Sequence, residues 1–185
     1  LLATLEVQMT DAILGTTATL KGLDGEVAVD GSQFDHLFTD GERLRLGDAE
    51  VRVIAVPGHT PDSIAYLIGD ALFPGDSIFM PDGGTARCDF PGGNAHALYR
   101  SIRRLFQLPD ATRVFVCHDY GPGGRALACE TTIGAEKAGN IHVGGNADEG
   151  DFVQQRTARD ATLAPPALMV PSIRANIRGL QAPVP

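Results

Sequence analysis

The sequence has few cysteines and no long apolar run, and both features restrict the setting in which the protein can work. Its three cysteines include no C-x-x-C pair, so they suit neither a disulfide framework nor a structural zinc knuckle. No segment approaches the roughly 18 consecutive apolar residues that a membrane-spanning helix requires. We therefore expect a reduced, cytoplasmic setting and no membrane partner.

Basic residues are also scarce relative to acidic ones. The chain contains 15 Lys and Arg against 23 Asp and Glu, which gives a formal charge of −8. Nucleic-acid affinity depends on a basic surface, so we expect no nucleic-acid partner. Hydrophobic residues make up 43% of the chain and charged residues 21%, a balance typical of a globular protein with a buried core.

The length predicts one domain over residues 1–185, although the two ends are weakly patterned. Residues 1–30 fit at most a short amphipathic helix near Leu5 to Leu14, and residues 165–185 form a proline-rich tail that we expect to be extended. The chain opens on Leu1 without the basic segment or cleavage signature of a signal peptide.

The middle of the chain predicts a mixed sheet. Residues 44–56 and 64–73 each indicate a β-hairpin around a Gly-Asp turn, and the segment PGHTPDS at 57–63 interrupts the strand pattern between them. A Gly- and Pro-rich loop at 75–93 follows. It is longer than ordinary connections, and such loops are often functional.

Helices and a further strand complete the pattern. Asn94 is expected to cap a helix that runs to about residue 107, and residues 113–117 indicate a short buried strand. Two more helices are predicted over 126–138 and 148–163. Because hairpin and crossover connections both occur, the fold class is α/β (α+β) with helices packed on a mixed sheet.

Three polar residues follow three of these strands directly. They are His59 in VPGHTPDS, Asp76 in LFPGDS and His118 in VFVCHDY. Taken singly, a His after a strand or an Asp after Gly is more often a turn residue than a ligand. Taken together, imidazole and carboxylate groups at neighbouring strand ends are suited to holding a metal ion.

These motifs resemble the metallo-β-lactamase superfamily, whose fold is an αββα sandwich with mixed sheets. The longer blocks A-R-C-D-F, L-Y-x-S-I and H-D-Y, with the later ETT, GNIHV and PSIRANIR, are similar to its persulfide (sulfur) dioxygenase branch. The resemblance covers roughly residues 30–180. It implies oxidation of glutathione persulfide, or a related small persulfide, to sulfite and thiol with O2 at one non-haem Fe(2+).

The resemblance also implies roles for seven residues. The implied metal ligands are His59 and Asp76, and the implied catalytic residues beside the metal are His118 and Tyr120. The implied substrate-binding residues are Arg87, Asp89 and Thr60. Arg87 would hold a glutathione carboxylate and Asp89 would orient its loop.

One departure from the family pattern is large. The superfamily's first metal motif, H-x-H-x-D-H, is missing, and His36, His96 and His142 belong to no such motif. We expect His36 to lie in a linker, His96 on the surface and His142 without a partner. An N-terminal truncation is the favoured explanation and a natural short form is the alternative. Either predicts weak metal binding and little or no dioxygenase activity from these residues alone.

Two other functions remain open at this stage. In a zinc-dependent thioesterase or lactonase of the same fold, Asp76 would bridge two Zn(2+) ions and His118 would bind the second. Alternatively, the chain is a degenerate, non-catalytic homologue that forms a homodimer through an exposed sheet edge.

The cysteines carry separate expectations. Cys88, next to an arginine, is either a reactive thiol or a packed one, and the packed interpretation is favoured. Cys117 is expected to point to the sheet face opposite His118, and Cys129 to lie on a helix.

Overall fold

The computed structural model describes residues 18–22, 25–29 and 36–167. The chain divides into two units, residues 1–37 with 162–185, and residues 38–161. In the first unit, β1 (Ala18–Gly22) and β2 (Gly25–Val29) pair as an antiparallel hairpin. The helix predicted near the start of the chain and most of the predicted tail lie outside the described residues.

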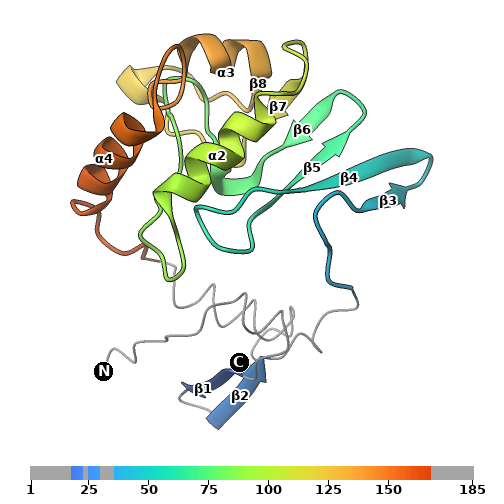
Figure 1. The fold of residues 1–185 in the computed structure, drawn as a ribbon, viewed down its shortest axis with the longest axis vertical. Coiled ribbons are helices and arrows are strands. Elements are labelled where there is room, and N and C mark those ends of the chain that lie inside the picture. Colours follow the sequence, from blue (N-terminus) through green and yellow to red (C-terminus); the bar gives the residue numbers. More distant parts are fainter. Residues whose placement is uncertain (1–17, 23–24, 30–35, 168–185) are drawn as a thin grey trace. The chain divides into compact units, whose positions relative to one another are not determined.

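The second unit is built on a six-stranded mixed sheet, shown in Figure 1. Its strands, in chain order, are β3 (Arg43–Leu46), β4 (Ala49–Ala55), β5 (Ile64–Ile68), β6 (Ala71–Phe73), β7 (Arg113–Phe115) and β8 (Glu130–Thr132). They are also neighbours in this order, and all pairs are antiparallel except the parallel pair β6–β7. The predicted α/β class with a mixed sheet is therefore confirmed.

Both predicted hairpins are present. The β3–β4 turn uses Gly47 and the β5–β6 turn uses Gly69, each with φ of +60°. Glycine adopts this left-handed conformation without the steric cost that a side chain imposes. The two Gly-Asp pairs were sufficient to locate these turns, because the backbone there requires glycine.

The parallel pair is connected by α2 (Ala95–Leu105), which lies in front of the sheet in Figure 1. The Asn94 side chain accepts a hydrogen bond from the Ala97 N–H at 2.9 Å, as expected of an N-cap. The predicted apolar stripe of α2 is buried against the sheet. Its members, all 3% exposed or less, are Leu98, Ile102, Leu105 and Phe106.

The helix predicted over 126–138 is wrong in its first half. The Ala128 N–H donates to the Asp119 carboxylate at 2.7 Å, so this segment is tied to the loop after β7 rather than wound into a helix. Residues 130–132 form β8, in which Thr131 pairs with Val114 of β7. β-branched threonines suit this edge strand.

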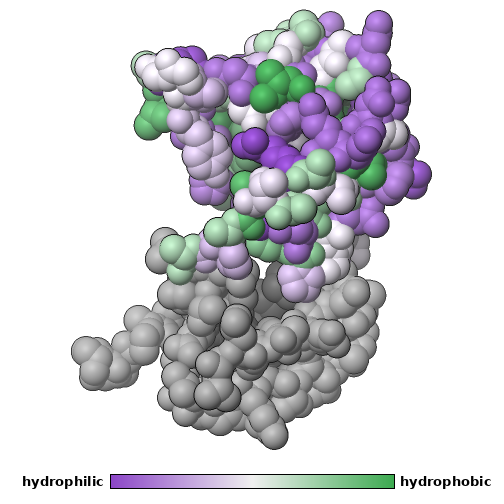
Figure 2. Space-filling view, turned by 90° about the vertical axis from the view of Figure 1, so that its left-hand side faces the viewer, coloured by the Kyte–Doolittle hydropathy of each residue, from purple (hydrophilic) through white to green (hydrophobic). Residues whose placement is uncertain are grey.

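Two further helices follow the sheet. α3 (Ile133–Gly139) begins after the capping residue Thr132, and α4 (Glu149–Asp160) begins after Asp148. Phe152 of α4 is 1% exposed, which confirms its predicted place on the apolar side. Figure 2 shows the side of the unit on which α4 lies in Figure 1, and its surface is largely hydrophilic. No helix in the described ranges is long and apolar enough to cross a bilayer.

Candidate metal centre

The sheet topology brings the three predicted polar loops to one edge. β4 and β6 are both antiparallel to β5, and β6 is parallel to β7. The three strands therefore run in the same direction and end at the same edge of the sheet. The residues that follow these strands include His59, Asp76 and His118 respectively, so the loops that carry them open on the same side.

Asp76, Cys117 and His118 form a group of possible metal ligands whose donor atoms all lie within 4.8 Å of one another. The Cys117 thiol donates to Asp76 Oδ1 at 3.1 Å, and His118 Nε2 lies 3.3 Å from the same oxygen. Cys117 therefore shares a face with His118, and the predicted opposite orientation is wrong. The reason is that β7 ends at Phe115, so strand alternation does not extend to these residues.

Cys117 is a protonated thiol in this arrangement. Partial desolvation of the sulfur, followed by its hydrogen bond to the Asp76 carboxylate, raises the pKa of Cys117 to about 12. The thiol is thus a hydrogen-bond donor to Asp76 at neutral pH.

His59 is not a member of this group of three, but its imidazole is held in one orientation. Its Nδ1 lies 2.7 Å from the carbonyl oxygen of Arg87. A carbonyl can only accept, so Nδ1 carries the proton and, in the neutral ring, Nε2 carries the lone pair. Metal-binding histidines commonly have this arrangement, in which a backbone carbonyl fixes the tautomer. The His59 ring also packs edge-on against Phe90, with centroids 5.0 Å apart.

The loop carrying His59 is anchored to α2. The Asn94 N–H donates to the Gly58 carbonyl at 2.8 Å, and the Ser101 hydroxyl donates to the Pro57 carbonyl at 2.7 Å. Gly58 lies so close to the helix that a Cβ there would be 2.3 Å from Leu98 Cα. The loop can therefore seat on α2 only with glycine at this position.

Thr60, predicted to bind substrate, lies in the same loop and is engaged locally. Its hydroxyl lies 2.8 Å from the Ser63 hydroxyl, and its N–H donates to the same oxygen at 3.2 Å. These contacts close a tight turn after His59. A role for Thr60 in substrate binding remains a prediction.

Arg87 and Asp89, in the A-R-C-D-F loop, form a paired fork. Arg87 Nε and Nη2 lie 2.5 and 2.6 Å from the two Asp89 oxygens, and the Arg87 guanidinium sits 5.1 Å from the Phe90 ring centre. The hydrogen bonds from Arg87 hold the pKa of Asp89 below its usual range. Asp89 thus orients the Arg87 side chain, while the Arg87 backbone carbonyl binds His59.

A buried ion pair in α4 contacts the backbone of the A-R-C-D-F loop and the residue before it. Arg156 and Asp160 of α4 are 3% and 5% exposed and lie 2.6 Å apart. Asp160 also accepts the Cys88 N–H at 2.8 Å, and Arg156 donates to the Thr85 carbonyl at 3.1 Å. Burial raises the pKa of the Cys88 thiol to about 12, so Cys88 is the packed thiol favoured by the sequence.

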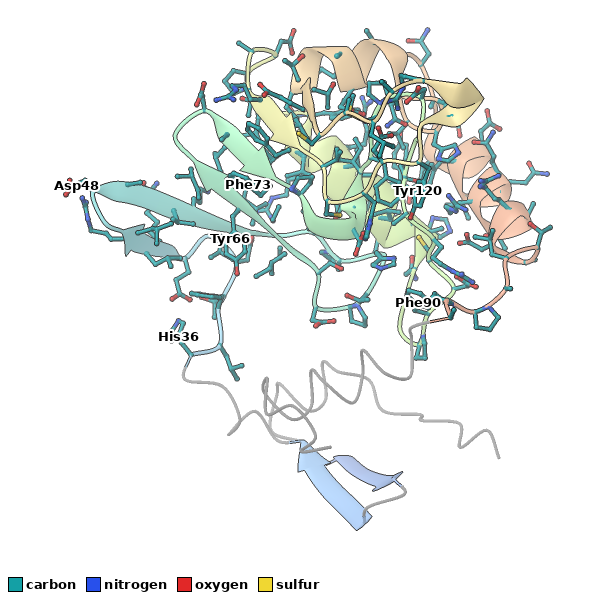
Figure 3. The ribbon with its side chains drawn as sticks, turned by 180° about the vertical axis from the view of Figure 1, so that it is seen from behind. His36, Asp48, Tyr66, Phe73, Phe90 and Tyr120 are labelled. Carbon is teal, nitrogen blue, oxygen red and sulfur yellow. The ribbon has the colours of Figure 1, made fainter. Side chains whose placement is uncertain are left out.

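The H-D-Y turn is fixed by a residue that the sequence did not single out. Arg125 donates to Asp119 at 2.8 Å and to Asp82 at 2.7 Å, joining the loops after β6 and β7. These hydrogen bonds hold the pKa of Asp119 well below its usual range. Tyr120 is exposed and stacks beside His118, with centroids 6.2 Å apart. In Figure 3, Tyr120 lies at the opposite end of the sheet from the β3–β4 turn at Asp48.

The remaining histidines are not members of the group formed by Asp76, Cys117 and His118. His36 is exposed, and His96 is exposed with its Nδ1 2.9 Å from a Glu149 oxygen, as its predicted surface position implies. The prediction that His142 lacks partners is wrong. Its Nδ1 accepts the Thr85 N–H at 2.9 Å, and burial lowers its pKa to about 4. Sequence gave no sign of this contact because 57 residues separate the partners.

The donor chemistry at this edge fits a divalent metal ion. It combines an imidazole with a fixed tautomer, a carboxylate and a second imidazole, on loops that are anchored by α2, α4 and Arg125. Asp76 and His118 keep 39% and 54% of their side chains exposed, so an ion has access. Rigidly supported nitrogen and oxygen ligands of this kind suit iron or zinc.

Comparison with known proteins identifies the family. The sequence model of the metallo-beta-lactamase superfamily matches residues 4–118. A probable metallo-hydrolase of Burkholderia pseudomallei is 49% identical over 85% of this chain and 57% of its own length. Glyoxylase B2 of Dictyostelium discoideum is 47% identical over 91% of this chain and 58% of its own. The chain thus spans somewhat over half the length of these relatives.

A solved structure agrees with the sequence matches. The crystal structure of ETHE1 from Myxococcus xanthus aligns with a TM-score of 0.68 and 37% identity, over 78% of this chain and 60% of that one. The family model covers β4, β6 and β7 together with His59, Asp76 and His118. The chain belongs to the metallo-β-lactamase superfamily.

Proposed function

We propose that the protein is a persulfide dioxygenase of this superfamily. It would convert glutathione persulfide or a related small persulfide, with O2 and water, to the thiol, sulfite and two protons. The iron would be held by His59 and Asp76, with ligands beyond these two. The likeness to ETHE1 supports this assignment. The predicted cytoplasmic setting and homodimer stay predictions.

The observation that carries the proposal is the contact between the branch-specific loop and a metal ligand. The A-R-C-D-F loop provides the Arg87 carbonyl, which binds His59 Nδ1 at 2.7 Å, and Phe90, which packs on the same ring. The block that resembles the dioxygenase branch would therefore orient His59, the proposed ligand. A loop with only a distant structural role would not make these contacts.

The chain's own residues would prepare the site in three ways. The Arg87 carbonyl fixes the His59 tautomer, so that Nε2 carries the lone pair that a metal ion would bind. The Arg87 guanidinium, aligned by its hydrogen bonds to Asp89, would place a positive charge where it attracts a glutathione carboxylate. Tyr120 stacks beside His118, and His118 lies next to Asp76, so these two rings would line one side of the persulfide site. Iron(II), when bound, supplies the oxygen chemistry that side chains cannot.

The test compares two activities in one preparation. The 185-residue chain is supplied with Fe(2+) or Zn(2+), and oxygen uptake with glutathione persulfide is measured beside hydrolysis of a glutathione thioester. We expect a low, iron-dependent oxygen uptake that yields sulfite and is lost in Asp76→Ala, with His96→Ala as the control. Zinc-dependent hydrolysis without iron-dependent oxygen uptake would overturn the proposal.

A zinc hydrolase is the second candidate, and one distance favours it. His118 Nε2 lies 3.3 Å from Asp76 Oδ1, the arrangement expected if Asp76 bridges two ions and His118 binds the second. The names of the relatives, metallo-hydrolase and glyoxylase, agree with this alternative. The same two-activity measurement separates it from the dioxygenase.

A further inference from the structure

We propose that Cys117 is a metal ligand, and that Asp76, Cys117 and His118 together bind a divalent ion of borderline or soft character. The inference rests on the metal-dependent function proposed above. It adds a thiolate sulfur to a donor set that the resemblance limits to imidazole and carboxylate groups.

The spacing of the donor atoms carries the inference. Metal–ligand bonds of about 2.0–2.3 Å, at angles between 90° and 109°, separate neighbouring ligand atoms by roughly 3.0–3.5 Å. Cys117 Sγ and His118 Nε2 lie 3.1 and 3.3 Å from Asp76 Oδ1, and all three atoms fall within 4.8 Å of one another. One ion can therefore contact all three atoms with small side-chain adjustments.

The loops that present these donors are independently braced. Asp76 follows β6, while Cys117 and His118 follow β7, its parallel neighbour. Arg125 links the two loops through its ion pairs with Asp82 and Asp119. This brace holds the donors together, so binding requires little ordering of the chain.

Sulfur ligation has a consequence for the choice of ion. On binding, the Cys117 sulfur exchanges its proton for the metal, the proton leaves to solvent, and no oxidation state changes. A thiolate ligand favours Zn(2+) and Co(2+) over hard ions such as Mg(2+). These three residues would supply one oxygen, one sulfur and one nitrogen, and they leave a position for His59, the other proposed ligand.

Cobalt titration provides the test, because a thiolate bound to Co(2+) gives an intense near-ultraviolet charge-transfer band. The 185-residue chain is titrated with Co(2+) without oxygen, beside Cys117→Ser and Cys129→Ser. Cys129 is an exposed free cysteine outside the group, which makes it the matched control. Circular dichroism of each variant checks that the fold is retained.

We expect the band in the unmodified chain and in Cys129→Ser, and its loss in Cys117→Ser. Visible cobalt bands without the charge-transfer band, or a band that survives Cys117→Ser, would overturn the ligand assignment while leaving a metal centre. Absence of any cobalt binding would count against both the ligand assignment and the proposed metal-dependent function.

Discussion

Replacing Gly58 with alanine tests the packing that seats the His59 loop on α2. Gly58 has φ of +147°, and a Cβ built there would lie 2.3 Å from Leu98 Cα and 2.4 Å from Leu98 N. The clashing atoms belong to the helix backbone. They cannot move away as the end of a flexible side chain could.

Two costs add in this variant. A side chain at positive φ costs about 1–2 kcal/mol, and forced overpacking costs about 1–3 kcal/mol more. Gly47→Ala is the matched control, because Gly47 also has positive φ, +60°, but nothing lies within 4 Å of its Cβ. We expect Gly58→Ala to lower the free energy of unfolding by about 2–5 kcal/mol and Gly47→Ala by about 1–2 kcal/mol.

Urea unfolding followed by circular dichroism measures the difference. Thermal unfolding should agree, at about 2–4 °C of Tm for each kcal/mol in a chain of this size. Equal destabilisation by the two substitutions would refute the close approach of the His59 loop to α2.

Three further changes have defined outcomes. Glu136 is fully buried, and burial raises its pKa to about 7 from 4.5. Because the folded state holds this proton more tightly than the unfolded state, the free energy of unfolding falls as pH rises from 4.5 to 7. Glu136→Gln should gain up to about 3 kcal/mol over the parent across this window in urea unfolding, and a constant difference would contradict the burial effect. Asp160→Ala leaves Arg156 buried without its carboxylate and should cost about 3–5 kcal/mol of unfolding free energy; a loss below 1 kcal/mol would be inconsistent with a buried pair. Arg87→Ala should raise KM for glutathione persulfide about tenfold with a smaller change in kcat, whereas an unchanged KM would exclude carboxylate binding.

The sequence predicted those elements whose signal is local. The Gly-Asp turns located two hairpins, and the helical spacing of apolar residues after the capping residue Asn94 located α2. The segment 126–138 was mispredicted because its first half is held by Asp119, which is a tertiary contact without a local pattern. Once that contact ties down Ala128, the threonines that follow pair with β7 instead of entering a helix.

In the candidate site, too, the sequence predicted the local features and missed the contacts between distant residues. Topology brings the loops of His59, Asp76 and His118 to one edge, as their positions directly after predicted strands suggested. The orientation of Cys117 was mispredicted because the strand ends two residues earlier than the apolar run indicated. The Arg125 brace and the burial of His142 depend on partners distant in the chain, which periodicity and motif spacing do not report.

The most direct measurement of the proposed metal centre is the imidazole nitrogen-15 spectrum of the chain during titration with Zn(2+), a diamagnetic ion. Without metal, His59 should show a protonated Nδ1, as its contact with the Arg87 carbonyl requires. With one equivalent of Zn(2+), the Nε2 signals of His59 and His118 should shift while His96 stays unchanged. A shift confined to His96, or a His59 ring that does not respond, would contradict the proposal that these strand-end loops form one metal centre.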